Sequence, residues 1–351
     1  MSNYLINGNG STFLTDGIKT IIRESKSYIK ACNFLFQDAE IVKLLKDASD
    51  RGVAIFIISN IQLNDYLEEE EGKKNRQKND NTTLPNLNDL KNKGCHVHLL
   101  KELHAKFIIG DGTRGIIMSA NFASNSISYN TETGLYVYNE ELHDLEYIFE
   151  MLYLSSDITD IDKDEKRNVF SKKTRQVKVD MQQHLKSRVR FTIASQKKDN
   201  NLSECQITSI YDSILNIINQ ANKELYIVTW HFKALNHLPG FIDSIKKAIN
   251  RGVKVIVYSN MYGQGSNSLG PSLDEVKKLE KIGCATYGDD NNHSKCVVSE
   301  NEGILFTANI DGISGMLCGF ETGCILLKDD CTSAVNHIKS LISKIDNSKK
   351  Q

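Results

Sequence analysis

The sequence predicts an α/β protein built from two similar halves. The His-x-Lys segments at 104–106 and 293–295 are each followed by an apolar run, an acid and a Ser/Thr-Ala-Asn triplet. A second parallel links RGVAIFIISN, from residue 51, to RGVKVIVYSN, from residue 251. Apolar runs also alternate with helical patterns, which is typical of strands in a largely buried sheet flanked by helices. A duplicated α/β unit accounts for all three observations.

The predicted elements follow the same order in each half. A helical pattern comes first, at residues 17–31 and 209–225, and leads into the apolar runs ACNFLF and LYIVTW. A second helix ends at Asp50 or Asn250, and AIFIIS or KVIVYS then has the composition of a central strand. The segments LKNKGCHVHL and LEKIGCATYG follow, and TGLYVYN and TGCILLK close the halves. Trp230, the single tryptophan, ends an apolar run and is expected in the core.

The His-x-Lys segments are predicted to be strands that present both functional groups on one face. Side chains alternate along a strand, so His104 and Lys106 point one way and the residue between them points the other. Asp111 then begins the turn DGTRG, and the return strand GIIMSAN brings Ser119 and Asn121 back to the same end. The first motif is therefore a predicted hairpin.

The tripeptide His-x-Lys alone is a weak signal. It occurs three more times, beginning at His184, His231 and His337, but without the acid and the Ser/Thr-x-Asn that follow the other two copies. We interpret these three as ordinary surface or helix residues. His96 and His98 have no further ligands at metal-binding spacing and are interpreted as residues on a strand face.

We predict two lobes, residues 1–155 and 189–351, joined by a charged linker at 156–188. Between Asp162 and Asp199 the chain carries 12 Lys or Arg against 5 Asp or Glu. This basic stretch fits a solvated tether, or a contact with nucleic acid or another acidic partner. The insert LEEEEGKKNRQKNDNTT, at 67–83, is expected to be a surface loop near the site entrance or a disordered segment.

Composition limits the possible functions. With 351 residues and 40% hydrophobic content the chain can bury two cores, and a formal net charge of −1 gives it no global attraction to DNA or anionic lipid. The sequence begins without the features of a secretion signal and contains no apolar run of membrane-spanning length, so we expect a cytoplasmic protein without stable membrane insertion. The eight cysteines are expected to be reduced core residues.

With these residues in view, the chain resembles the phospholipase D superfamily, whose halves carry His-x-Lys-x4-Asp-x6-Gly-Ser-x-Asn. The first copy keeps this spacing, with Met118 in place of the glycine. The second copy departs further: Glu300 stands in the position of the aspartate, the next interval is one residue shorter, and Phe306 and Thr307 replace Gly-Ser. The resemblance covers nearly the whole chain outside the linker.

The resemblance implies two pseudo-symmetric α/β/α lobes, each with a mixed central sheet, and an active site at the lobe interface. It also implies a metal-independent reaction without a cofactor, in which one histidine attacks phosphorus and the other protonates the leaving oxygen. The implied catalytic residues are His104, Lys106, Asn121, Glu132, His293, Lys295, Asn309 and Glu321, with Asp111, Ser119, Glu300 and Thr307 in support.

The chemistry of these side chains fits such a reaction. Lysine and asparagine would bind the non-bridging oxygens of a phosphate, and each glutamate would accept an imidazole N–H. Which glutamate serves which histidine is left open. We choose His104 as the nucleophile because its motif is better preserved, although the pseudo-symmetry leaves the order open. Tyr129 and Asn130, in the loop after the first motif, are candidates to line the cleft.

Three functions are compatible with the sequence. The leading one is a phosphodiesterase, a nuclease cleaving DNA or RNA through a phosphohistidine. The second is a phospholipase or phosphatidyltransferase acting on phospholipids, and the third is a binding module of a cytosolic defence or repair complex with weak or no turnover. Two halves in one chain suffice for one site, so a monomer can be active and the oligomeric state stays open.

Overall fold

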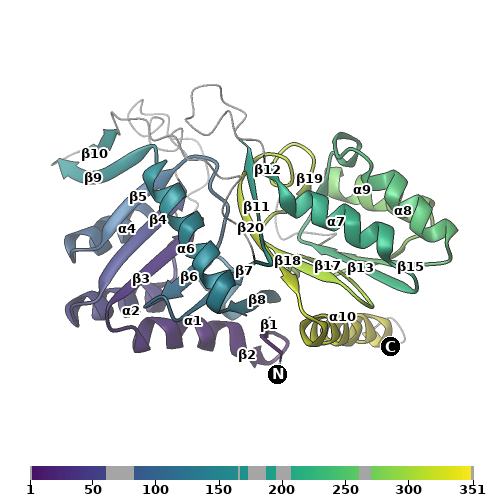
Figure 1. The fold of residues 1–351 in the computed structure, drawn as a ribbon, viewed down its shortest axis with the longest axis horizontal. Helices are drawn as coiled ribbons and strands as arrows, with labels where there is room; N and C mark the ends of the chain where they lie inside the picture. Colours follow the sequence, from purple (N-terminus) through teal and green to yellow (C-terminus); the bar gives the residue numbers. More distant parts are fainter. Residues whose placement is uncertain are drawn as a thin grey trace.

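The computed structural model describes residues 2–60, 83–164, 167–172, 187–194, 207–260 and 270–348. Two lobes lie side by side, and helices cover the sheet in each of them (Figure 1). The predicted α/β class with two mixed sheets is confirmed. The insert at 67–83, apart from Thr83, and residues 173–186 of the predicted linker lie outside the described ranges.

Within the described residues, the first lobe has a ten-stranded sheet in the order β10-β9-β5-β4-β3-β6-β7-β8-β1-β2. Its strands are β1 (Tyr4–Gly8), β2 (Ser11–Thr12), β3 (Tyr28–Asn33), β4 (Ala54–Asn60), β5 (His96–Leu100), β6 (Phe107–Gly110), β7 (Arg114–Met118), β8 (Glu132–Val137), β9 (Ile158–Asp164) and β10 (Arg167–Lys172). Its helices are α1 (Phe13–Glu24), α2 (Ala39–Asp50), α4 (Thr83–Asn92), α5 (Ser124–Ser128) and α6 (Asn139–Leu154).

The described part of the second lobe has an eight-stranded sheet in the order β12-β11-β20-β18-β17-β13-β15-β16, and β14 pairs with β19 separately. The strands are β11 (Val189–Ala194), β12 (Ile207–Thr208), β13 (Glu224–Thr229), β14 (Phe232–Lys233), β15 (Lys254–Ser259), β16 (Ala285–Gly288), β17 (Cys296–Ser299), β18 (Gly303–Phe306), β19 (Ile310–Asp311) and β20 (Gly319–Leu326). The helices are α7 (Ser209–Gln220), η1 (Leu235–His237), α8 (Phe241–Asn250), α9 (Gly270–Lys281) and α10 (Lys328–Ser348).

The two sheets share one topology. From β5 to β2 the first sheet has the same strand order as the second sheet from β16 to β12, with parallel pairs at one edge and antiparallel pairs elsewhere. The first sheet is longer because the hairpin β9–β10 joins its edge beside β5. This hairpin lies in the stretch predicted as a linker, so the start of that stretch is folded onto the first lobe.

The repeated Arg-Gly-Val has a structural explanation. Gly52 and Gly252 follow α2 and α8 with φ of 87° and 88°, a left-handed conformation that glycine adopts without strain and that ends a helix. The side chains of Arg51 and Arg251 donate to carbonyl groups at the ends of α1 and α7, for example to Ile22 at 2.9 Å. Helix α2 accordingly ends at Asp50 and helix α8 at Asn250, as predicted.

The lobes share a continuous hydrophobic core. One cluster of buried side chains contains Phe107 and Phe149 from the first lobe together with Tyr226 and Phe320 from the second. The last helix of each half reaches the other lobe, since α6 contacts β11 and α10 contacts β1. The hydrophobic effect therefore holds the two halves together as one body, which gives the interface between them a defined geometry.

Two further observations concern membrane-spanning helices and cysteines. Among the described helices, none combines the length and the apolar character needed to cross a bilayer. The cysteines within the described ranges are buried and form no disulfide bonds: Cys32, Cys95, Cys284, Cys296, Cys318, Cys324 and Cys331. Burial raises the pKa of the Cys95 thiol to about 11, as expected for an apolar core residue.

Candidate active site

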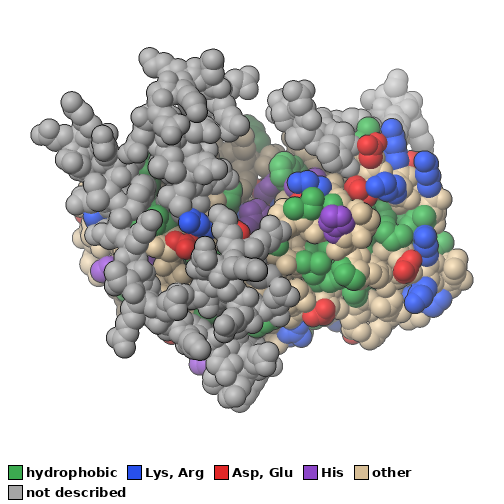
Figure 2. All heavy atoms as spheres, turned by 90° about the horizontal axis from the view of Figure 1, so that it is seen from above, with side chains coloured by type: hydrophobic (Ala, Val, Ile, Leu, Met, Phe, Trp, Pro, Cys, Tyr) green, Lys and Arg blue, Asp and Glu red, His purple; other side chains and the backbone are tan. Residues whose placement is uncertain are grey.

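The two His-x-Lys segments meet where the lobes face each other. The backbone N–H of His104 donates to the carbonyl of Phe320 at 2.9 Å, and that of His293 donates to the carbonyl of Thr131 at 2.9 Å. Phe320 and Thr131 each come directly before the glutamate of the opposite motif. Viewed from above, the molecule is hollowed between the lobes, and histidine side chains lie beside this hollow (Figure 2).

The prediction that the His-x-Lys residues are strands is wrong. The strands β6 and β17 begin only at Phe107 and Cys296, so both tripeptides precede them. The N–H groups of His104 and His293 bond to the other lobe, whereas the carbonyls of Lys106 and Lys295 pair with their own sheets. The predicted hairpin is nevertheless present, because β6 pairs with β7 and the Met118 N–H donates to the Lys106 carbonyl at 3.0 Å.

The imidazole–carboxylate pairs cross between the lobes. His104 Nδ1 lies 2.7 Å from Glu321 Oε1, and His293 Nδ1 lies 2.8 Å from Glu132 Oε1. An ionised carboxylate only accepts hydrogen bonds, so it favours the tautomer in which Nδ1 carries the proton. The Nε2 of each histidine is then left with a lone pair. Each half of the chain thus supplies the carboxylate that orients the imidazole of the other half.

Ser119 and Thr307 hold these glutamates in place. The hydroxyl of Ser119 donates to the second carboxylate oxygen of Glu132, and that of Thr307 donates to Glu321. Each hydroxyl also accepts a backbone N–H from the strand that carries the glutamate, at 2.9 Å and 3.0 Å. Threonine in the second motif retains the hydroxyl, so its departure from serine preserves the arrangement.

Both motif lysines are fully buried. Lys106 and Lys295 are each 0% exposed, and each Nζ donates to the carbonyl of the histidine two residues earlier, at 2.7 Å and 2.8 Å. Burial lowers the pKa of Lys106 to about 7 and that of Lys295 to about 8, although Glu321 and Glu132 partly oppose it. An anionic ligand near these groups would favour their charged forms.

The pKa values of both histidines and of both glutamates are lowered. Burial holds the pKa of His104 at about 4 and also lowers that of His293, and the ammonium groups of both lysines add to the effect. Burial alone would raise the pKa of Glu321, but His104 and Lys106 outweigh it and the pKa is lowered. The ammonium group of each lysine lowers the pKa of the histidine in the opposite lobe, so the titrations of these groups are coupled.

The two motif asparagines also occupy equivalent positions. Asn121 and Asn309 follow Ser119 and Thr307 by two residues in each half. Each has a buried amide oxygen without a hydrogen-bond partner in the described structure. A buried polar group without a partner costs free energy, of the order of 1–3 kcal/mol. Both asparagines therefore retain hydrogen-bonding capacity that a ligand can use.

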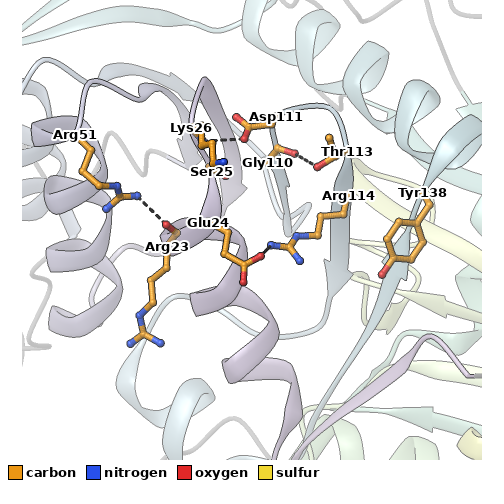
Figure 3. A pocket seen from close by; sticks show the side chains of 10 residues that line it. All are labelled: Arg23, Glu24, Ser25, Lys26, Arg51, Gly110, Asp111, Thr113, Arg114 and Tyr138. Atoms are coloured by element: carbon orange, nitrogen blue, oxygen red, sulfur yellow. Dashed lines mark hydrogen bonds and ion pairs between the residues drawn. The ribbon is translucent and has the colours of Figure 1, made fainter.

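The acids of the two motifs lie away from the histidines. Asp111 is at the opposite end of β6 and accepts the N–H groups of residues 26–28 at 2.8–2.9 Å. Glu300 accepts those of Asn222 and Lys223 at 2.9 Å and 3.0 Å, so glutamate serves the same turn in the second lobe. Asp111 borders an open pocket of about 770 Å³, whose charged lining is shown in Figure 3. This pocket is separate from the paired histidines.

The structure corrects the expectation for Trp230. Its strand ends at Thr229, and the indole is 39% exposed with its ring centroid 5.5 Å from that of His293. In the first lobe Phe34 follows β3 in the same way, with its ring 5.4 Å from His104. Phe34 was not singled out in the sequence. Aligning the halves on Phe36 and Phe232, instead of on the start of the apolar runs, would have matched these two aromatic residues.

The remaining sequence candidates lie in other environments. His96 stacks on Phe56 and His98 on Tyr153, and the described residues contain no group of three or more His, Cys, Asp or Glu able to hold a metal. His337 is on α10, whereas His231 lies directly after Trp230 and close to the site. His184 is outside the described residues. Tyr129 is 72% exposed beside the interface residue Thr131, and its contact with a substrate stays a prediction.

The fold and the site together define a two-lobe α/β protein in which two His-Lys-Glu sets converge from duplicated halves. Residues 18–153 match the family model described as the PLD-like domain of cardiolipin synthase. The second lobe repeats the same topology and motif. The family-model match identifies residues 18–153 as a PLD-like domain.

Solved structures show the same fold over the whole chain. Phosphatidylserine synthase from Haemophilus influenzae Rd KW20 is 13% identical with a TM-score of 0.61, covering 99% of this chain and 86% of that chain. Polyphosphate kinase from Porphyromonas gingivalis is 14% identical with a TM-score of 0.55, covering 95% of this chain, which spans only 49% of the kinase. At such identities the likeness concerns the fold.

A shorter match covers part of the chain. Nuc from Salmonella typhimurium, a phospholipase D family member, is 18% identical with a TM-score of 0.36, over 44% of this chain and 97% of that chain. No curated protein sequence matches this chain.

Proposed function

We propose that the chain is a phosphodiesterase that cleaves nucleic acid through a phosphohistidine intermediate. The observation that carries the proposal is the crossed pairing of His104 with Glu321 and of His293 with Glu132, beside two buried lysines. Duplicated imidazoles supply a nucleophile and a proton donor, and duplicated ammonium groups supply charge for one phosphate between them.

In the proposed first step, His104 Nε2 attacks phosphorus. The low pKa of His104 keeps this nitrogen unprotonated at neutral pH, and Glu321 holds the Nδ1 proton. A nitrogen–phosphorus bond forms while the bond from phosphorus to the leaving oxygen breaks. That oxygen takes the proton from His293, which the anionic substrate and Glu132 together favour in its protonated form.

In the second step, water replaces the histidine. His293, now neutral, accepts a proton from water, the oxygen attacks phosphorus, and the bond between phosphorus and His104 breaks. Lys106, Lys295, Asn121 and Asn309 would bind the non-bridging oxygens throughout. Loss of one preorganised donor of this kind commonly costs about 10²–10³ in turnover. The two ammonium groups supply charge that a divalent metal supplies in other phosphodiesterases, so no proposed step needs a metal.

Two features support nucleic acid as the substrate. The stretch from Asp162 to Asp199 carries 12 basic against 5 acidic residues, a charge pattern suited to a polyanion. Trp230 presents an exposed aromatic surface beside His293, and such a surface suits a nucleobase. A phosphatidyltransferase is the second candidate, because the phosphatidylserine synthase shares the fold over nearly the whole chain.

Hydrolysis assays in EDTA test the proposal. We expect the wild-type protein to cleave single-stranded DNA or RNA and bis(p-nitrophenyl) phosphate, and to release less headgroup from phospholipid vesicles. Faster headgroup release than nucleic-acid cleavage would favour the lipid candidate, and a strict requirement for a divalent metal would contradict the mechanism. If a His104→Ala variant matched the wild type on every substrate, a binding module would be the better interpretation.

The pH dependence of kcat/KM is expected to follow the lysines. A lysine whose pKa is lowered loses its proton at a lower pH than usual, and the proton donor His293 also has a lowered pKa, so we expect kcat/KM to fall as the pH rises through neutrality to about 8. On the acid side kcat/KM should fall near pH 4, where His104 becomes protonated and can no longer attack. Lys106→Met should lower turnover by more than about tenfold and raise the pKa of His104, because the ammonium of Lys106 lowers it.

Steady-state rates at constant ionic strength and NMR titration of the imidazole protons measure these effects. Lys101→Met, a replacement in the loop before the first motif, is the matched control and should leave the profile unchanged. A kcat/KM that rises steadily above pH 8 would contradict the requirement for charged lysines.

A further inference from the structure

The two lobes differ at the strand ends beside the histidines. In the first lobe β3 is followed by Phe34 and Leu35, whereas in the second lobe β13 is followed by Trp230 and His231. The Phe34 ring contacts His104 and also faces the ammonium of Lys106 at 5.8 Å. Its surface is thus used by groups of the protein, whereas Trp230 remains 39% exposed.

The indole of Trp230 is fixed by two imidazoles. Its ring centroid lies 5.5 Å from that of His293, at an interplanar angle of 56°, and 4.8 Å from that of His231, at 67°. The Trp230 carbonyl accepts the N–H of Asn260 at 3.0 Å, which anchors the backbone at this point. An aromatic ring with a fixed orientation loses little conformational entropy when a ligand stacks on it.

His231 lies close to a buried acid. His231 Nε2 lies 3.7 Å from Oδ2 of Asp311, which is 2% exposed. Asp311 also accepts the N–H groups of Ile313 and Ser314 at 2.7 Å and 3.2 Å and the Ser314 hydroxyl at 2.8 Å, so the carboxylate cannot swing away freely. The pairing of β14 with β19 sets Asp311 beside Lys233 in register.

The first lobe has no equivalent of this pair. The bridge between Phe36 and Phe122 in the first lobe is equivalent to the pairing of Phe232 with Ile310 in the second lobe. By this equivalence Leu35 occupies the position of His231, and Ala123 occupies that of Asp311. The second lobe therefore has a supported, exposed aromatic residue at the site, and the corresponding positions of the first lobe are apolar. A ligand beside His104 and a ligand beside His293 would therefore contact different side chains.

We propose that Trp230 is a stacking platform for the nucleobase next to the scissile phosphate, and that His231 and Asp311 are positioning residues that hold it. This inference rests on the proposed function and adds a substrate preference to it. A base inside a duplex has both faces covered by its neighbours, so it must leave the stack before it can lie on an indole. The site should consequently prefer single-stranded over double-stranded nucleic acid.

The single tryptophan makes the inference directly measurable. Because Trp230 is the only tryptophan of the chain, fluorescence excited at the red edge of the indole band, where tyrosine does not absorb, reports on this position alone. A His104→Gln variant, which should bind without cleaving, is titrated in EDTA with a short oligothymidylate, an abasic oligomer of equal length and a duplex. We expect strong quenching by the oligothymidylate, with the other two binding about tenfold more weakly, the scale of one base–aromatic stack.

Equal affinity for the oligothymidylate and the abasic oligomer, without quenching, would overturn the stacking site. Phosphatidylglycerol vesicles are the lipid probe in the same experiment. A blue-shifted, enhanced emission with vesicles and no response to the oligothymidylate would also overturn it, because the indole would then face an apolar chain.

Cleavage assays separate this inference from the proposed function. Trp230→Ala should lower kcat/KM for single-stranded DNA about tenfold more than it lowers kcat/KM for the abasic oligomer, while Trp230→Phe should retain most activity. His231→Ala should raise KM without a matching loss of kcat. Phe13→Ala, at an aromatic residue 68% exposed at the start of α1, is the control.

The two kinds of failure give different results. If the wild-type protein cleaves neither nucleic acid nor the abasic oligomer, the proposed function is wrong. If it cleaves both, and Trp230→Ala lowers both rates equally or neither, only the stacking site is wrong. Circular dichroism of each variant confirms that a lost rate reflects the site and not the fold.

Discussion

Replacing His104 with alanine is expected to abolish phosphodiester cleavage, with a loss of at least about 10⁴-fold in turnover, because no other group can take the place of a covalent nucleophile. Glu321 holds Nδ1 of this imidazole, so that Nε2 is the atom available for attack. His143→Ala is the control, since that side chain is 86% exposed on α6.

The variant His293→Ala should reveal the intermediate. With bis(p-nitrophenyl) phosphate the leaving group departs without needing a proton, so the first step proceeds while the second lacks its base. We expect a burst of one equivalent of nitrophenolate and a phosphoramidate on His104 that is labile in acid and stable in base. Mass spectrometry of the quenched protein locates it. A burst from His104→Ala and none from His293→Ala would reverse the assignment of the two histidines.

Replacing Glu321 with glutamine is expected to lower turnover through its effect on His104, although Glu321 belongs to the second lobe and His104 to the first. A glutamine amide can donate to Nδ1 and so favour the wrong tautomer, an effect that costs about 10⁴-fold in a serine protease triad. Removing the charge should also lower the pKa of His104 further, because Glu321 raises it at present. Turnover and NMR titration of both imidazoles measure the two effects.

The reciprocal variant strengthens this test. Glu132→Gln should affect His293 in the same manner and leave the His104 titration nearly unchanged. Glu140→Gln, an exposed residue at the start of α6, is the matched control. Crossed pairing is contradicted if Glu321→Gln shifts the pKa of His293 and leaves that of His104 in place.

The crossed pairs also explain why one chain carries both halves. Each imidazole lies within 2.8 Å of the glutamate of the other lobe, and a shared hydrophobic core holds the lobes in register. A lobe by itself would present a histidine without its orienting acid. Duplication within one chain therefore builds a single composite site, in which the order of the two histidines is set by their surroundings.

Local features of the sequence predicted much of the fold. The ends of α2 and α8 at Asp50 and Asn250 follow from the Arg-Gly pair that comes next, and the hairpin β6–β7 follows from the turn after Asp111. These elements depend on interactions between residues close together in the chain, which periodicity and turn chemistry reveal. The same local logic failed where β9–β10 forms within a charged stretch, because pairing to β5 outweighs its polar composition.

Spacing along the chain revealed the duplication and the α/β class, and it singled out the histidines, lysines and glutamates as candidates. The packing of the two lobes sets which glutamate lies beside which histidine, how the lysines are buried and that Trp230 lies next to His293. His104 and Glu321 are 217 positions apart, and their contact exists only because the lobes pack face to face. No local sequence pattern encodes such a pair, because the contact depends on how the two sheets pack against each other.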